Sequence, residues 1–305
     1  MNETDIQTFA QYFPTPSHVY NSVKFNLLNS HKVRAIHPLL FSDKKVRMGI
    51  LLGEDDKLLK SPFSAPYGGF CSNGKQCLEM MEKATELLRQ YSLQRGKRCR
   101  ITLPPLAYDM SQGAKWANVL GRKCVESHMD LNYHMPLCND TPYESLISST
   151  ARNKLKQATR HPFQLTRLDS NLSAEVARAY AIIKRNRDEH NYPLRMSLDN
   201  VLQTTRIIKA DFFVLSVYGE DVAAAQVFHV AEGIAQVIYW GDLKEHSHLR
   251  TMNILAAMLY RHYTHQGLRM LDIGPSCEDG LPNYGLCSFK EDVGCQVSPK
   301  YTFMI

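Results

Sequence analysis

The chain has 305 residues, a formal net charge of +6 and 44% hydrophobic residues, with ample length for two domains. No apolar run approaches the 18 residues of a membrane-spanning helix, and the first five residues are polar and acidic, unlike a targeting leader. These features argue against a membrane span, and we expect a cytoplasmic protein. The modest positive charge leaves a polyanionic ligand open, such as a nucleotide, coenzyme A or tRNA.

The eight cysteines are scattered along the chain and form no CxxC pair. Several of them lie within apolar or strand-like runs. This distribution is typical of reduced thiols that pack as small hydrophobic side chains. It argues against a disulfide framework and a zinc site, and we expect no metal site in the protein.

The first part of the chain predicts a group of strands, then a helix, then a short buried strand. A cap-like segment precedes this group, and the glycine-bearing Tyr67-Gly68-Gly69-Phe70 loop interrupts it. In chain order, we predict a cap at 1–30, strands at 33–41, 46–52 and 58–63, a loop at 67–74, a helix at 75–94 and a strand at 99–103.

A helix at 110–120 and an alternating strand at 124–135 follow. Thr141-Pro142 then predicts a helix start, with threonine as the cap and proline at the first helical position. The later part of this helix is basic and ends near residue 160. We place the domain junction here, with one domain at 1–140 and a second at 141–305 that is entered through the basic helix.

The second part of the chain repeats the element order of the first. Three β-branched and aromatic runs are separated by hairpin-length turns, which predicts an antiparallel meander. Thr251 is the expected cap of the helix that follows, and Gly267 is its expected stop. The predicted elements are strands at 163–168, 211–218, 222–230, 234–240, 270–273 and 297–303, helices at 172–190 and 251–266, and a loop that ends in Phe289-Lys290.

This repetition predicts two copies of one α/β (α+β) unit, each a mixed, largely antiparallel sheet flanked by helices. Two further motifs carry a resemblance. Leu271-Asp272-Ile-Gly274-Pro-Ser276, followed by Phe289-Lys290 and Gly294, resembles the D-x-G … F-K-x-x-x-G signature of the FemABX-like branch of the GNAT superfamily of acyl-CoA N-acyltransferases. The stretch Arg152–Ala158 is similar to the R-x-x-x-R-K-A helix of that branch.

The resemblance implies two tandem GNAT-like units and a transferase that moves an acyl or aminoacyl group onto an amine. It implies no tightly bound cofactor. Acyl-CoA or aminoacyl-tRNA would be the co-substrate, because the branch is known for aminoacyl-tRNA donors in cell-wall peptide synthesis. The acceptor would be the amine of a small molecule or a peptide, and tRNA is a possible partner.

The connection at 241–253 departs from the pattern of acetyl-CoA-dependent GNAT enzymes. It lacks the Arg/Gln-x-x-Gly-x-Gly/Ala loop and has no glycine beyond Gly241. Arg250, Asn253 and backbone N–H groups at the start of the next helix can still hold a phosphate, since that interaction needs backbone rather than glycine itself. The sequence therefore leaves the acyl donor open.

Acyl transfer needs charge stabilisation on the carbonyl oxygen and a route for a proton. The resemblance makes Lys290 the candidate cation for the oxyanion. Asp272 is either a base or a brace for the N–H groups of Gly274 and Ser276. Tyr284 and Tyr239 are proton donors to the leaving group or ordinary half-buried tyrosines.

Two further groups are candidates for ligand binding. Arg152, Lys156 and Arg160 recur every four residues, which favours either a phosphate-binding strip or a solvated helix face. In the first half, Tyr67, Gly68 and Gly69 allow either close approach of backbone to a ligand or a turn. His229 is expected to be a satisfied core histidine.

Three functions remain open from the sequence. The first is an N-acyltransferase whose substrate lies near 272–276, Tyr239 and the basic helix. The second is a binding module that keeps the GNAT fold without catalysis. The third is an aminoacyl-tRNA-dependent peptidyltransferase, which requires the basic stretches at 95–100 and 152–160 to share one surface.

Overall fold

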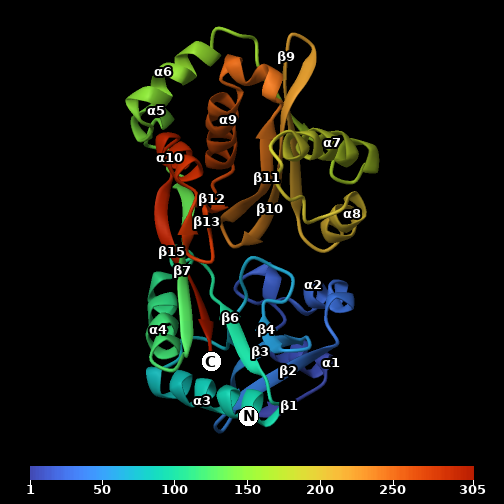
Figure 1. The fold of residues 1–305 in the computed structure, drawn as a ribbon, viewed down its shortest axis with the longest axis vertical. Coiled ribbons are helices and arrows are strands. Elements are labelled where there is room, and N and C mark those ends of the chain that lie inside the picture. Colours follow the sequence, from blue (N-terminus) through green and yellow to red (C-terminus); the bar gives the residue numbers. More distant parts are fainter. The chain divides into compact units, whose positions relative to one another are not determined.

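The computed structural model describes all residues from 1 to 305, and the chain forms two compact units (Figure 1). Unit 1 comprises Met1–Leu131, Cys277–Leu281 and Ser298–Ile305, and unit 2 comprises Asn132–Ser276 and Pro282–Val297. The expected division at residue 140 assigns the last strand wholly to the second part. In the structure the end of that strand belongs to unit 1, because it pairs with a strand of that unit.

The sheet of unit 1 has the strand order β1-β2-β3-β4-β6-β15, and β5 pairs with β3. The predicted strands and helices of this part are present, and the expected cap consists of short helices. The strands are β1 (Asn2–Glu3), β2 (Ala35–Ser42), β3 (Val46–Glu54), β4 (Leu58–Ser61), β5 (Cys71–Ser72), β6 (Arg98–Thr102) and β15 (Gln296–Met304), with β13 (Cys277–Glu278) and β14 (Leu281–Pro282) as a separate pair. The helices are α1 (Ile6–Tyr12), η1 (Val19–Asn21), α2 (Val23–Leu28), η2 (Ser30–Lys32), α3 (Leu78–Gln94) and α4 (Met110–Gly121).

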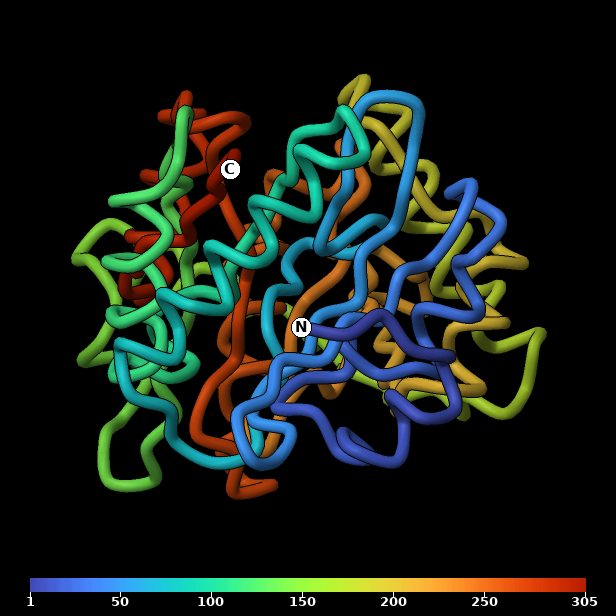
Figure 2. The backbone as a smooth tube through the Cα atoms, turned by 90° about the horizontal axis from the view of Figure 1, so that it is seen from below, coloured from blue at the N-terminus to red at the C-terminus, as the bar shows by residue number.

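Both faces of this sheet are covered, which explains why the central residues of β2 and β3 are buried on both faces. Leu39 and Phe41 of β2 join the core cluster that includes residues of α3 and α4, whereas Leu40 between them packs with Phe9 of α1. Figure 2 traces the N-terminal backbone, where β1 runs antiparallel to β2 with Asn2 opposite Leu40.

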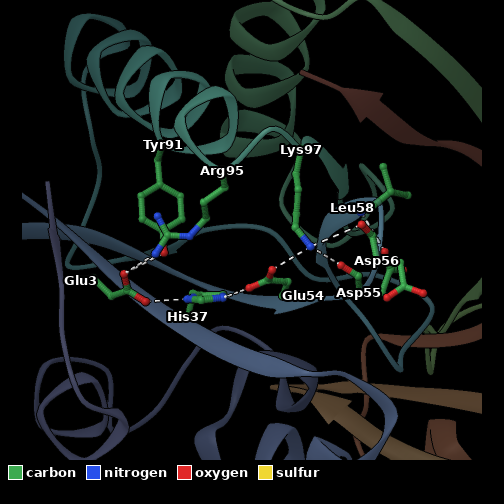
Figure 3. Close-up of polar contacts among 9 residues, drawn as sticks. All are labelled: Glu3, His37, Glu54, Asp55, Asp56, Leu58, Tyr91, Arg95 and Lys97. Carbon is green, nitrogen blue, oxygen red and sulfur yellow. Dashed lines mark hydrogen bonds and ion pairs between the residues drawn. The ribbon is translucent and has the colours of Figure 1, made fainter.

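A chain of ion pairs holds β1 in place (Figure 3). The ring of His37 lies between two carboxylates, 2.5 Å from Glu3 and 2.6 Å from Glu54. Arg95 pairs with Glu3 at 2.9 Å, and Lys97 pairs with Glu54 at 2.7 Å. Neighbouring strands and the end of α3 are therefore joined by a continuous chain of polar side chains.

The strands of unit 2 follow the order β7-β12-β11-β10-β9-β8, and unit 2 contains β7 from Asn132 onward. The predicted antiparallel meander is confirmed as β9 to β11. The strands are β7 (Glu126–Pro136), β8 (Gln164–Leu168), β9 (Ala210–Val217), β10 (Glu220–Ala231), β11 (Ile234–Asp242) and β12 (Met270–Pro275). The helices are α5 (Tyr143–Leu146), α6 (Ser149–Ala158), α7 (Ser173–Glu189), α8 (Leu198–Thr205), η3 (Lys244–Leu249), α9 (Thr251–His265) and α10 (Tyr284–Asp292).

Helices cover both faces of this second sheet (Figure 1). The ring of Phe213 in β9 lies 4.9 Å from that of His262 in α9, so the odd-numbered residues of β9 face α9. The buried carboxylate of Asp211 lies on this same face, where it accepts hydrogen bonds from Arg167, His229 and Tyr263. His229 is thus a satisfied histidine, as expected.

Several predicted helix boundaries were wrong. The helix expected from Thr141 consists of two helices, and Pro142 rather than Thr141 precedes the first. Ser148 interrupts it because its side chain accepts the N–H of Ala151 and caps α6. At α9 the cap is Arg250, in the left-handed conformation with φ of 64°.

Other elements were absent from the sequence prediction. The predicted loop before Lys290 contains β13, β14 and helix α10, which Asn283 caps through a hydrogen bond from Leu286 N–H. Helix α8 was also missed. None of the helices has the length and apolarity that crossing a bilayer requires.

Candidate functional site

Strands β11 and β12 of unit 2 are parallel and pair over only three residues, from Ile234–Met270 to Gln236–Asp272. Beyond this point β11 continues to Asp242 in the meander, while β12 pairs with β7 on its other side. A β-bulge lies in the β10–β11 pairing directly after Gln226. The two parallel strands therefore diverge at Asp272, and this divergence is the centre of the candidate site.

Asp272 is completely buried and joins three segments at the divergence. Its carboxylate accepts hydrogen bonds from Asn132 Nδ2 at 2.8 Å, Gln236 Nε2 at 2.7 Å and the backbone N–H of Gly274 at 2.9 Å. The expected hydrogen bond from Gly274 is thus present. Because these donors come from three strands, Asp272 fixes the position where β12 separates from β11.

Lys290 lies on α10 and is 3% exposed, rather than solvent-exposed on a loop. Its ammonium group donates to the carbonyl oxygens of Ile273, Gly274 and Pro275 at 3.2, 2.8 and 3.0 Å. The ammonium nitrogen also lies 5.4 Å from the centroid of the Tyr133 ring. A buried positive charge is therefore fixed at the end of β12, with its donors directed at backbone carbonyls.

The turn after β12 depends on an unusual backbone conformation. Gly274 has φ of +78°, which side-chain-bearing residues rarely adopt. Ser276 follows it, and its carbonyl oxygen accepts the N–H of Asn283 at 2.8 Å, at the start of α10. The Ser276 hydroxyl is buried without a hydrogen-bond partner. The motif residues Asp272, Gly274, Ser276 and Lys290 thus converge on one turn.

His134 of β7 lies directly across from Asp272 in the antiparallel register, so the two side chains share one face of the sheet. His134 is 6% exposed, and its Nδ1 has no hydrogen-bond partner. Burial lowers the pKa of His134, and the negative charge of Asp272 partly opposes this effect. The imidazole is therefore neutral at neutral pH and able to accept a proton.

A second polar group lies on the same face of the sheet. Gln226 of β10 is directly across from Tyr239 of β11, and Gln226 is completely buried with neither amide atom hydrogen-bonded. The hydroxyl of Tyr239 accepts the backbone N–H of Arg195 at 3.2 Å. Burial raises the pKa of Tyr239, so this hydroxyl keeps its proton at neutral pH.

The residues predicted to bind the donor lie near the start of α9 and along α6. Arg250 Nε donates to Gln157 of α6 at 3.1 Å, which connects α6 with the start of α9. Asn253 is buried in the first turn of α9. Arg152 donates to the carbonyl oxygens of Glu144 and Ile147, so it braces the α5–α6 turn.

Lys156 is exposed on α6, as either interpretation of the basic strip requires. Tyr284 is 78% exposed at the first position of α10. The structure therefore does not place the hydroxyl of Tyr284 in the hydrogen-bond network around Asp272.

The Tyr67-Gly68-Gly69 segment belongs to unit 1. A Cβ on Gly68 would lie 2.8 Å from both the Pro62 nitrogen and the Ser61 hydroxyl, so close backbone packing requires glycine here. Gly69 donates its N–H to that same hydroxyl at 3.0 Å. Tyr67 is completely buried, with its hydroxyl 3.0 Å from that of Tyr108. Close packing within unit 1 therefore explains why residue 68 is a glycine.

Asn132, His134 and Gln236 were not predicted as site residues. All three are polar side chains within strands that are otherwise largely buried, and Asn132 and His134 are two residues apart on one strand face. A polar residue within an otherwise apolar strand can be seen in the sequence, and it indicates a candidate site residue. Its partner cannot be identified from the sequence, because Asn132 and Asp272 are 140 residues apart.

No protein-family model matches the chain, and no curated protein matches it in sequence. Its structure is similar to that of FemX, with a TM-score of 0.69, 10% identity, and coverage of 100% of this chain and 98% of FemX. L-PGS from Bacillus licheniformis has a TM-score of 0.59 at 14% identity, over 99% of this chain and 92% of that one. The C-terminal domain of a protein from Agrobacterium fabrum, assigned as a lysylphosphatidylglycerol synthetase, has a TM-score of 0.62 at 10% identity, over 98% and 92% of the two chains.

These similarities establish the fold over the whole chain. The protein has the fold of FemX, and the predicted fold class is confirmed: a mixed α/β protein with a large, mostly antiparallel sheet flanked by helices.

Proposed function

We propose that the protein is a transferase that moves an acyl or aminoacyl group onto an amine, as a GNAT/FemABX-like N-acyltransferase. The observation that carries this proposal is the divergence of the parallel strands β11 and β12 at Asp272. An extended donor can hydrogen-bond to backbone groups of β11 beyond Gln236, where β12 no longer pairs with it. The reacting carbonyl would then lie near the turn at Gly274.

The reaction requires one bond to form and one to break. The acceptor amine loses a proton, and its nitrogen attacks the carbonyl carbon to form the C–N bond. The C–S bond of a thioester or the C–O bond of an aminoacyl ester then breaks, and the leaving group takes up a proton. His134 is neutral and can accept the proton from the amine, while Tyr239 keeps its own proton and can donate it.

Lys290 contributes in two ways in this proposal. Its three hydrogen bonds hold the end of β12 in place, so it positions the turn at Gly274. Its positive charge is buried and therefore weakly screened, and it lowers the energy of a nearby oxyanion even without a direct hydrogen bond. Asp272 is proposed to position the turn rather than to act as the base, because three donors already occupy its carboxylate.

The donor would be an acyl-CoA or an aminoacyl-tRNA. FemX and L-PGS are neighbours in fold only, at 10% and 14% identity, so they do not decide between the two donors. Arg250, held against Gln157, and the exposed Lys156 offer positive charge for the phosphates of either donor. The acceptor is proposed to be the amine of a small molecule or a peptide.

A calorimetric titration of the purified protein with acetyl-CoA, free coenzyme A and an aminoacyl-tRNA tests the proposal. Two glycine variants provide a matched comparison. Gly274 and Gly267 have φ of +78° and +73°, and a Cβ at either position meets no atom within 4 Å. Alanine therefore strains both turns similarly, but only Gly274 lies at the strand divergence.

We expect one donor to bind to the wild type and to Gly267→Ala, with roughly tenfold weaker binding to Gly274→Ala. Turnover is then followed as amine-dependent release of the thiol or of free tRNA. Binding of a donor without turnover over a broad amine panel would favour a non-catalytic binding module. That alternative gains support from the lack of a glycine-rich loop at 241–253. Absence of binding by every donor would refute the transferase.

A further inference from the structure

Arg187 near the C-terminal end of α7 is a half-buried cation whose only close partners are aromatic rings. Its guanidinium carbon lies 5.2 Å from the centroid of the Tyr239 ring and 5.7 Å from that of Tyr192. Its Nε is buried and has no hydrogen-bond partner. Buried cations in proteins are generally paired with anions, because leaving water without a counter-charge is costly.

The acidic residues nearest in sequence do not neutralise Arg187. Asp188 pairs with Lys184 at 2.7 Å, and Glu189 pairs with Arg185 at 2.9 Å. Burial lowers the pKa of Arg187, and the opposing electrostatic contributions come from Tyr239 and Tyr192 rather than from any carboxylate. The positive charge of Arg187 is therefore left for a group outside the chain.

A second observation points to the same place. Gln226 lies directly across from Tyr239 on the adjacent strand, so the two side chains share the face of the sheet on which Arg187 contacts Tyr239. Gln226 is completely buried, and both its amide oxygen and its amide nitrogen lack hydrogen-bond partners. Such a group is rare in a native core and calls for an explanation. Arg187, which lacks a counter-charge, and Gln226, which lacks hydrogen-bond partners, therefore lie on either side of Tyr239.

We propose that Arg187, Tyr192 and Tyr239 form a subsite for the carboxylate of the acceptor substrate, with Gln226 at its inner end. This inference rests on the proposed function, and it specifies the acceptor as an amino acid or short peptide with a free carboxylate. A guanidinium binds a carboxylate through two parallel hydrogen bonds, and the flanking tyrosine rings limit the freedom of both groups.

The charge of the subsite favours a carboxylate over a phosphate. The guanidinium of Arg187 lies over both rings, and its planar fork matches the two oxygens of a carboxylate. A phosphate group carries up to two charges and typically engages several donors. Arg185, two residues earlier, is already paired with Glu189 and Glu245.

The test is a calorimetric titration of the full-length protein with three probes: L-alanyl-L-alanine, L-alanyl-L-alaninamide and L-alanine. The two dipeptides differ only in the carboxylate, and the free amino acid distinguishes an amino-acid acceptor from a peptide acceptor. We expect L-alanyl-L-alanine, L-alanine or both to bind. The probe that binds should do so at least tenfold more tightly than L-alanyl-L-alaninamide. Inorganic phosphate should not displace the bound carboxylate probe.

Arg187→Gln should abolish this preference, and Arg187→Lys should restore only part of it, because lysine keeps the charge without the fork. Arg185→Gln is the matched control and should behave as the wild type. Tyr192→Leu provides a second variant if Arg187→Gln does not fold, and it should weaken binding of the carboxylate severalfold, since Tyr192 is 49% exposed and its replacement spares the core.

Three outcomes would overturn the proposal: equal binding of the carboxylate and amide probes, no binding of any probe, or a preference that persists in both Arg187→Gln and Tyr192→Leu. The titration contains no acyl donor and requires no turnover. A failure of the carboxylate subsite therefore leaves the donor titration intact, and an inactive protein that still prefers the carboxylate would refute the transferase while supporting the subsite.

Discussion

Nζ of Lys290 lies 2.8 Å from the carbonyl oxygen of Gly274, so a residue of α10 holds the turn that ends β12. Two more carbonyl oxygens, of Ile273 and Pro275, share the same ammonium group. Replacing Lys290 by methionine keeps the length of the side chain but leaves these carbonyls without their donor. The expected loss in the free energy of unfolding is about 3 kcal/mol.

Urea unfolding measures this loss, with Lys209→Met as the control because Lys209 is exposed. The control should leave the midpoint unchanged. If Lys290→Met has the stability of the wild type and only turnover is lost, the bracing role is wrong and Lys290 acts on the oxyanion alone.

Two buried glutamines on one face of the sheet should respond to methionine in opposite ways. Gln236 donates to Asp272 at 2.7 Å, whereas Gln226 has no partner for either amide atom. Gln226→Met removes an unsatisfied amide and should raise the free energy of unfolding by about 1 kcal/mol, while Gln236→Met should lower it by about 2 kcal/mol. Thermal unfolding of the two variants side by side gives the comparison. Destabilisation by Gln226→Met would show that the Gln226 amide has hydrogen-bond partners in the folded protein.

Asp211 should make stability depend on acid pH. Burial alone would raise its pKa, but hydrogen bonds and charges from His229 and Arg167 prevail and bring it from the ordinary 3.8 to about 2. Because the pKa is lower in the folded state, this stabilisation is present above about pH 4 and is lost as the pH falls toward 2. The contribution at neutral pH is roughly 2 kcal/mol.

Unfolding free energies measured between pH 5 and pH 2 test this dependence. Asp211→Asn should be less stable at pH 5, and its stability should change less as the pH falls. An unchanged pH slope in the variant would show that other carboxylates control acid unfolding.

The ion-pair chain around His37 should control the order of the N-terminal strand (Figure 3). Glu3→Gln weakens the contacts of β1 with His37 and Arg95, and amide exchange of Thr4, which donates to Pro38 at 3.0 Å, should accelerate at least tenfold. Global stability should fall by less than about 1 kcal/mol, because Glu3 is partly exposed. Hydrogen exchange followed by NMR, with the exposed Glu79→Gln as control, distinguishes local release from global unfolding. Unaltered exchange at Thr4 would show that backbone pairing alone holds β1.

Much of the fold could be predicted because strand signals are local. Hairpin spacing and β-branched residues located β9, β10 and β11 to within a few residues. Helix interruptions were less accessible, since Ser148 divides α5 from α6 through a single side-chain cap. Helix α10 was missed because it has only nine residues, too few to show a helical period clearly, and it is fixed by the contacts of Lys290.

The candidate site was only partly predictable for the same reason. The motif residues Asp272, Gly274 and Lys290 were located by resemblance, and they do converge in space. Their burial and partners depend on register between strands that are distant in the chain, as for His134 across from Asp272. The unpaired charge of Arg187 is visible only once its neighbours Asp188 and Glu189 are seen to pair elsewhere.

The last strand affects how this protein is made. Residues Thr302–Met304 of β15 pair with Arg100–Thr102 of β6, so the sheet of unit 1 receives a strand that the ribosome adds about 200 residues after its neighbour. Until then the edge of β6 is unpaired, which exposes it to pairing with other nascent chains. During translation the sheet of unit 1 is therefore completed only when the last strand has emerged, although most of the sequence of this unit emerges first.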